Sequence, residues 1–185
     1  MSRIAIDISK SKQAGKLVIK RWLLEKITEY CLYAMFVFLL PFIAVMEINS
    51  DLNKNESIVL SLLFLVLAIT LSSLFMYSII TMNSLKRIHG LSRGKNLNLI
   101  KKIAKNHNWN ISSTNQQITI IQFSWQETGI DWSKQMTVLY DENDILVNCI
   151  SFGFGSSPSP FHWFANKRKV DKLKIEFENE IKNHN

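Results

Sequence analysis

The sequence has few of the residues from which disulfide frameworks and metal sites are built. Its two cysteines, Cys31 and Cys149, lie in an apolar run and in a predicted strand, so a disulfide between them is not expected. Neither has a Cys or His neighbour at metal-ligand spacing, and the four histidines form no H-x-x-H or H-E-x-x-H pair. We therefore predict no metal site and no cofactor.

Patterns for phosphate binding and acid–base catalysis are also missing. The GFG sequence at residues 153–155 lacks the helix and the lysine that follow the glycines of a P-loop. Glu127 and Asp131 lie in a predicted loop, whereas a catalytic carboxylate pair needs a fixed separation. Cys149 alternates with apolar strand positions, which favours a small core residue over a nucleophile. The prediction is a protein with no catalytic residues that is not an enzyme.

Charged residues are absent from two long stretches, residues 30–46 and 57–85, which contain 17 and 29 residues. A helix needs about 20 apolar residues to span a bilayer. We predict a transmembrane hairpin over 30–85, with spans at about 28–47 and about 58–82 and an external loop at about 48–57. A signal peptide is a competing interpretation of the first run, but a second apolar run follows it. A buried soluble hairpin is the other alternative, and the second run is longer than a normal core helix.

Positive charge is concentrated on both sides of the predicted hairpin. Residues 1–29 and 86–105 are rich in Lys and Arg, whereas the loop contains Lys54 among acidic residues. The positive-inside rule then predicts that both termini are cytoplasmic. We expect an integral membrane protein, in a bacterial inner membrane. Topology and anionic lipid account for much of the net charge of +7, so membrane lipid is an expected partner and nucleic acid is not.

Neither predicted span has an ionisable residue in its middle, which argues against a proton relay or an ion-coupled site. The second span instead has small and hydroxyl residues recurring at three or four residues, on one helical face. Such residues let helices approach closely. We consider three roles for this face: packing against the first span, self-association of several copies, and lining of a pore. Its members are Ala68, Thr70, Ser73, Tyr77 and Thr81.

Residues 95–185 are predicted to form a small cytoplasmic α+β domain: a helix ending near His107, three to four antiparallel strands, and a helix at about 166–182. A sheet with one face covered by the two helices satisfies this order. Residues 84–96 are interpreted as a connector. The fold class is thus a membrane protein with a two-helix transmembrane hairpin and an α+β domain.

The N-terminal segment, residues 1–29, is predicted to contain a strand and then a helix that leads into the membrane. Apolar and polar residues alternate over 3–9, with Ile4, Ile6 and Ile8 on one side. We expect this strand to add to an edge of the sheet, to pair with a partner, or to be replaced by an amphipathic surface helix.

The sequence SSPSPFHWFANKRKV, residues 156–170, combines an aromatic run with consecutive cations. We expect residues 161–164 to close one end of the core, and Asn166 to cap the last helix. The cations would face an anion or a lipid headgroup, and a protein or nucleotide is the other possible partner. The candidate contact residues are Trp163, Lys167, Arg168 and Lys169.

These features predict a non-enzymatic accessory, scaffold or regulatory subunit that acts through its cytoplasmic domain. The expected assembly is a homo-oligomer or a larger membrane complex, with a protein partner that the sequence does not identify. The alternative is a self-assembling, membrane-perturbing or pore-forming effector of the bacterial defence type, triggered through the cytoplasmic domain. The hydroxyl face of the second span is the feature that supports this alternative.

Overall fold

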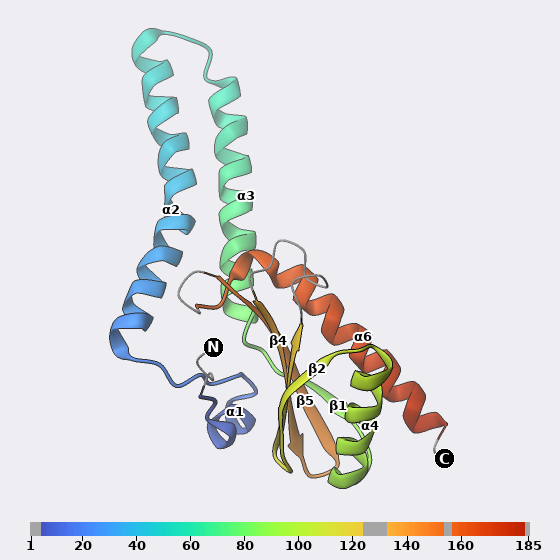
Figure 1. Cartoon of the computed structure of the whole chain (residues 1–185). Helices are drawn as coiled ribbons and strands as arrows, with labels where there is room; N and C mark the ends of the chain where they lie inside the picture. Colours follow the sequence, from blue (N-terminus) through green and yellow to red (C-terminus); the bar gives the residue numbers. More distant parts are fainter. Residues whose placement is uncertain (1–4, 124–132, 154–156, 184–185) are drawn as a thin grey trace. The chain divides into compact units, whose positions relative to one another are not determined.

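The computed structural model describes residues 5–123, 133–153 and 157–183 (Figure 1). The chain forms two compact units. One is a helical hairpin, Arg21–Thr81. The other is a domain made of two separate stretches, Met1–Lys20 and Met82–Asn185, which we call the discontinuous domain. The hairpin is therefore an insertion within the sequence of the domain.

The hairpin consists of α2 (Leu23–Lys54) and α3 (Val59–Thr81), which run antiparallel (Figure 1). Among the described residues, these two helices are long and apolar enough to cross a membrane by length and composition. The chain reverses at Asn55, whose φ of 55° is left-handed, and the Glu56 N–H then donates to the Asp51 carbonyl at 3.0 Å. Two apolar helices were predicted here, and the structure contains them.

Small side chains occupy the face of α3 that is buried within the hairpin. The buried residues of α3 are Ser61, Ala68, Ser72 and Ser78. Those of α2 are Tyr33, Val37, Ala44 and Asp51. Small residues let two helical backbones approach closely. Apart from Tyr33 and Val37, the large apolar side chains are mostly exposed, as Phe38 of α2 and Leu60 of α3 illustrate.

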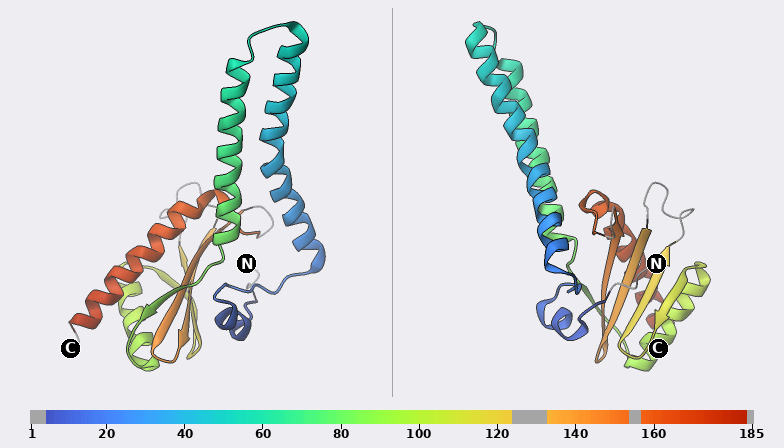
Figure 2. Two further views of the ribbon diagram at one scale, coloured as in Figure 1. Left: turned by 180° about the vertical axis from the view of Figure 1, so that it is seen from behind. Right: turned by 60° about the vertical axis from the view of Figure 1, so that its left-hand side comes forward.

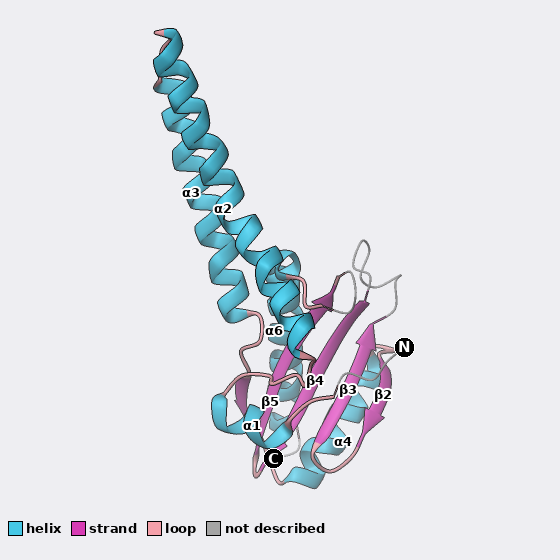
Figure 3. Ribbon diagram, turned by 90° about the vertical axis from the view of Figure 1, so that its left-hand side faces the viewer, coloured by secondary structure: helices cyan, strands magenta, loops and turns pink. Residues whose placement is uncertain are grey.

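A five-stranded antiparallel sheet, ordered β1-β5-β4-β3-β2, forms the centre of the discontinuous domain (Figure 3). Its longest pairing joins β4 and β5 through a tight turn in which Glu142 has a φ of 51°. The strands are β1 (Lys86–His89), β2 (Asn110–Thr114), β3 (Ile118–Phe123), β4 (Ser133–Asp141) and β5 (Asp144–Phe152).

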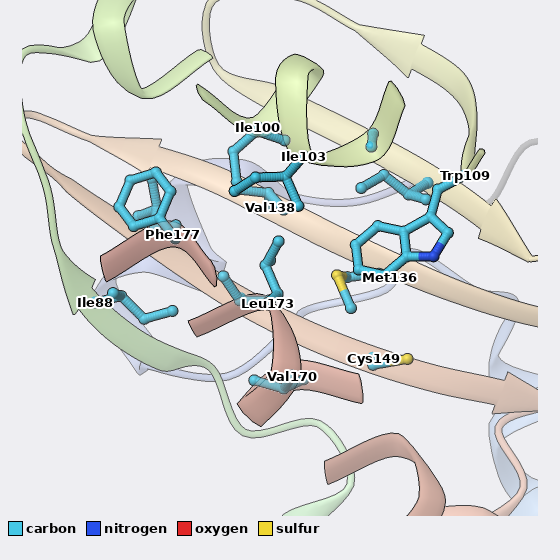
Figure 4. Close-up of a cluster of buried hydrophobic side chains, with 14 of the residues drawn as sticks. Ile88, Ile100, Ile103, Trp109, Met136, Val138, Cys149, Val170, Leu173 and Phe177 are labelled. Carbon is cyan, nitrogen blue, oxygen red and sulfur yellow. The ribbon is translucent and has the colours of Figure 1, made fainter. Parts of the chain in front are cut away.

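Two helices, α4 (Arg93–Asn106) and α6 (Trp163–Lys182), cover one face of this sheet. Their apolar residues recur at helical spacing and meet the alternate positions of β4 and β5 that point the same way. The predicted order of helix, strands and helix is confirmed for this face. Its centre contains Ile100, Ile103, Met136, Val138, Leu173 and Phe177 (Figure 4).

β1 lies in the segment 84–96 that was predicted to be a connector, so that prediction was wrong. The strand has only four residues, and Ile88 is the buried one. Its pairing with β5 matches Lys86 with Val147 and Ile88 with Ile145, which adds a fifth strand to the predicted three to four. A strand this short depends on its long-range partner, and local alternation does not reveal it.

The N-terminal segment is not an edge strand, because β1 and β2 occupy the two edges of the sheet. Ile6 makes only an isolated bridge to Ile19, and the chain forms helix α1 (Ile8–Ala14) with Asp7 as its N-cap. The Asp7 carboxylate accepts a hydrogen bond from the Lys10 N–H at 3.2 Å, which satisfies a free donor of the first turn. In place of the strand predicted over 3–9, the described residues form an isolated bridge at Ile6 and then α1, while residues 3 and 4 lie outside the described part of the chain.

This N-terminal segment covers the second face of the sheet, opposite α4 (Figure 2, right). Ile6 and Ile8 pack on Ile118, Leu139 and Leu146. Leu17 and Ile19 pack on Ile150 and Phe152. The prediction of one covered face was thus incomplete, since apolar residues on both faces of β4 and β5 are buried.

The stretches that precede and follow the hairpin are hydrogen-bonded to each other inside the domain. The Leu17 N–H donates to the Asn83 carbonyl at 2.7 Å, and the Leu85 N–H donates to the Gly15 carbonyl at 2.9 Å. Gly15 has a φ of 61°, a conformation that glycine adopts without strain. The domain thus includes residues 1–20 and 82–94, beyond the predicted limits of 95–185.

Candidate functional site

The aromatic and basic segment starts in a short 3-10 helix, η2 (Pro160–His162), and continues into α6. The chain before it is fastened to the end of β5. The Ser159 N–H donates to the Ser151 carbonyl at 2.8 Å, and Pro158 forms a bridge with Phe152. Pro158 and Pro160 are both buried, so they fix the start of the segment against the sheet.

Of residues 161–164, which were predicted to close the core, Phe161 and Phe164 do not, while Trp163 is half-buried. Phe161 is 63% exposed and Phe164 is 56% exposed. α6 begins at Trp163, and its buried positions are Asn166, Val170, Leu173 and Phe177. Phe164 precedes Asn166 by two residues, about 200° around the helix, and therefore points away from the core.

Asn166 does not cap α6, in contrast to the prediction. Its side chain is 5% exposed and accepts a hydrogen bond from the Ser151 hydroxyl at 2.9 Å. A buried amide needs such a partner because burial removes its bonds to water. Asn166 thus joins α6 to β5.

The side chains of Lys167, Arg168 and Lys169 do not lie together, because the first two contact rings of α6 and the third contacts a ring of β3. The Arg168 guanidinium lies 4.4 Å from the centroid of the Phe164 ring, and the Lys167 Nζ lies 5.7 Å from that of Trp163. Lys169 instead lies 4.8 Å from the centroid of the Phe123 ring. Lys167 and Arg168 are exposed, whereas Lys169 is half-buried. The structure therefore brings Trp163, Lys167 and Arg168 together and separates Lys169 from them.

A polar cluster that the sequence did not reveal joins the C-terminal end of α4 to α6. The His107 Nε2 lies 2.5 Å from the Glu176 carboxylate, and the His107 ring stacks on Trp109 with centroids 5.0 Å apart. Lys172 lies 3.9 Å from the same Glu176. The spacing of Lys172 and Glu176 is a detectable helical pair, but the contact with His107 depends on the tertiary fold.

The residues predicted to form one face of the second span do not share one environment: one of them is buried within the hairpin, and the others lie on the opposite side of α3. Ala68 is 1% exposed and is buried within the hairpin. The hydroxyls of Thr70, Ser73 and Thr81 donate to carbonyls four residues earlier in α3, and Tyr77 is 52% exposed. The serines buried inside the hairpin, Ser61, Ser72 and Ser78, lie on the other side of the helix.

The remaining candidates offer no site geometry. Cys149 is 4% exposed and lies in the core beneath α6, as expected for a small core residue (Figure 4). Glu127, Asp131 and Gly155 fall outside the described residues. Within the described part of the chain, no group of three His, Cys, Asp or Glu residues is placed to hold a metal ion.

Comparison of the chain with protein-family models, with curated proteins and with solved structures gave no match.

Proposed function

We propose that this protein is an integral membrane protein that acts as a non-enzymatic accessory, scaffold or regulatory subunit through the discontinuous domain. In this proposal α2 and α3 cross the membrane, and the domain lies on its cytoplasmic side. The observation that carries the proposal is the hydrogen-bonded clamp between residues 15–17 and 83–85, on either side of the hairpin.

The distribution of side chains in the hairpin supports membrane insertion. Only 17% of the most apolar window of each helix is buried, although its mean hydropathy is above 2. In water, such an apolar surface would be expected to drive aggregation. In a bilayer, it faces lipid while small residues pack inside.

The clamp also supports an even number of membrane crossings. Leu17 and Asn83 are joined by a backbone hydrogen bond, so the two ends of the hairpin belong on one side of any membrane. The excess of Lys and Arg in these flanks favours the cytoplasmic side.

A regulatory role is supported by the direct link between the hairpin flank and the central sheet. The side-chain NH₂ of Asn148, on β5, donates to the carbonyls of Met82 and Ser84, each at 2.9 Å. Met82 follows the last residue of α3 directly. Displacement of the end of α3 would thus displace an inner strand of the sheet, and the domain would transmit a change in a membrane partner through this strand.

The test is to isolate the full chain from its native membrane in a mild detergent and to measure the composition of the complex by native mass spectrometry. A second membrane protein present in fixed stoichiometry supports the proposed role. A particle that contains only copies of this chain contradicts it.

A self-assembling effector is the second candidate, favoured by the exposure of Thr70 and Ser73 on α3. Growth arrest and entry of a membrane-impermeant dye on overexpression would support this candidate. Replacement of Ser73 by Leu should then reduce dye entry, whereas an accessory subunit should cause no dye entry at all.

A further inference from the structure

The discontinuous domain buries its large apolar side chains except on one surface. Among its described residues, the exposed large apolar side chains are Phe161, Phe164 and Ile175. All three belong to η2 or α6. Phe164, Arg168 and Ile175 are four and seven residues apart, which places them on one face of the helix.

Cations accompany the exposed rings on this surface. Arg168 covers the Phe164 ring and Lys167 approaches the Trp163 ring, at the distances given above. The first turns of α6 contain no acidic residue before Asp171, which pairs with Lys86 at 2.5 Å. Rings with cations beside them match a lipid interface, where apolar groups enter the headgroup zone and cations meet phosphate.

The surface lies at the end of the sheet that contains the C-terminal end of β5. The residues that connect α3 to β1 lie at the same end. β1 pairs with β5 so that Lys86 opposes Val147, and Asn148 then binds the carbonyls of Ser84 and Met82. Residues 86 to 82 therefore run toward the end of β5. The same end is bridged to Pro158, directly before η2.

We propose that Phe161, Phe164, Lys167 and Arg168 contact the anionic phospholipid headgroups of the membrane that the hairpin crosses. This inference rests on the proposed membrane topology. A soluble anion would need the cations alone, whereas the two exposed phenylalanines favour a surface with an apolar layer beneath its charges. The contact would hold this end of the domain against the bilayer.

The test uses the full chain with Cys31→Ser, reconstituted into nanodiscs of neutral lipid or of neutral and anionic lipid in a ratio of about 3:1. An environment-sensitive fluorophore is attached at Ala165→Cys, an exposed position beside Phe164, while buried Cys149 remains. We expect a blue shift and quenching by nitroxide-labelled lipid in the anionic discs, both reversed by high salt. The same fluorophore at Asn179→Cys, exposed near the other end of α6, should respond to neither lipid.

Two variants that remove the same charge distinguish a local contact of α6 with lipid from an effect of the net charge of the protein. Lys167→Gln with Arg168→Gln should abolish the response to anionic lipid. Lys101→Gln with Lys105→Gln removes the same charge from exposed positions of α4 and should preserve it. Phe161→Ser with Phe164→Ser should weaken nitroxide quenching most.

The inference is overturned by equal signals in neutral and anionic discs, by no signal in either, or by an equal loss in both cation variants. It is also overturned if heparin produces the blue shift in neutral discs, since the ligand would then be a soluble polyanion. Alkaline extraction of the same discs distinguishes the two proposals. A chain released by alkali contradicts membrane insertion, whereas a retained chain with an unresponsive fluorophore contradicts the headgroup contact alone.

Discussion

The hairpin and the discontinuous domain use apolar residues in opposite ways. In the hairpin, Leu60 is 77% exposed, while Ala68 and Ser72 are buried. In the domain, Leu173 and Phe177 are fully buried. Burial of large apolar groups stabilises a fold in water, whereas close approach of small groups stabilises helices in lipid. This contrast is the one expected if the hairpin inserts into a membrane, as proposed, while the domain folds in water.

Exposed hydroxyls of α3 and buried polar side chains of the domain have different partners, although Ser61 and Asp51 also bond to each other across the hairpin. In the hairpin, the Thr70 and Ser73 hydroxyls bond to carbonyls of their own helix, at 2.8 Å each. In the domain, Asn148 bonds to residues more than 60 positions away, and Ser151 bonds to Asn166. Local bonds suit a helix whose surroundings offer no water, and long-range bonds fix the tertiary fold.

The largest effect is expected from a large-to-small change in the core of the domain. Phe177→Ala should lower the free energy of unfolding by about 3 to 5 kcal/mol, because it leaves a cavity beneath α6. Leu60→Ala, on the outside of the hairpin, should change it by less than about 0.5 kcal/mol. In the full chain in detergent, exchange of the β4 and β5 amides measures the first effect, and exchange of the α2 and α3 amides measures the second. Equal losses of stability would contradict the claim that large apolar side chains stabilise the domain by burial and do not stabilise the hairpin in this way.

A smaller effect is expected from the link between the hairpin flank and β5. Asn148→Ala removes both donors and leaves the Met82 and Ser84 carbonyls without them. We expect a loss of about 2 to 3 kcal/mol in the stability of the domain, since buried groups without partners are costly. Asn179→Ala, at an exposed position of α6, serves as the control. Unchanged amide exchange in residues 82–88 of the Asn148 variant would show that this link is dispensable.

Two adjacent serines test the interior of the hairpin. Ser72 is buried between the helices and Ser73 is exposed. Ser72→Leu should force α2 and α3 apart at a cost of about 1 to 2 kcal/mol, whereas Ser73→Leu should leave the hairpin intact. Exchange of the α2 and α3 amides in detergent distinguishes them. If Ser73→Leu alone had an effect and also reduced the oligomer mass, the outer face would be a contact between copies.

The smallest effect concerns acid stability. Hydrogen bonds from Arg87, and then from His89, lower the pKa of the Asp144 carboxyl below its ordinary value. The unfolded chain therefore binds a proton before the folded chain as the pH falls. This stabilisation is complete above the ordinary pKa of about 3.9 and is lost as the pH falls through the lower folded value.

Asp144→Asn should accordingly reduce the pH dependence of unfolding below about pH 4. The comparison is a series of unfolding curves of both proteins at falling pH. An unchanged slope would mean that this exposed carboxylate contributes nothing to the pH dependence of stability.

Much of the fold could be predicted because its signals are local. The pairing of β4 with β5 follows from their alternation and turn, and α6 follows from Val170, Leu173 and Phe177. β1 was missed because its formation depends on β5, and Ile88 alone marks its buried side. The N-terminal alternation was misinterpreted because Asp7 starts a helix in the middle of it.

The candidate surface was predicted in composition but not in orientation. Its cations and rings are consecutive in the sequence, so their proximity was expected. The direction of Phe164 depends on where α6 begins, and Asn166 suggested a start three residues too late. The bond between Asn166 and Ser151 forms only once α6 packs on β5, so the sequence offers no signal for it.

The most direct test of the account is the sidedness of three labels in intact cells. Single cysteines replace Gln13, Asn53 and Asn179 in the Cys31→Ser background, at exposed positions in the N-terminal segment, the hairpin tip and α6. If both flanks of the hairpin are cytoplasmic, an impermeant maleimide should modify Asn53→Cys before permeabilisation, and the other two only after it. Modification of Gln13→Cys and Asn179→Cys from opposite sides of the membrane would contradict a single domain in which residues 15–17 and 83–85 are hydrogen-bonded to each other.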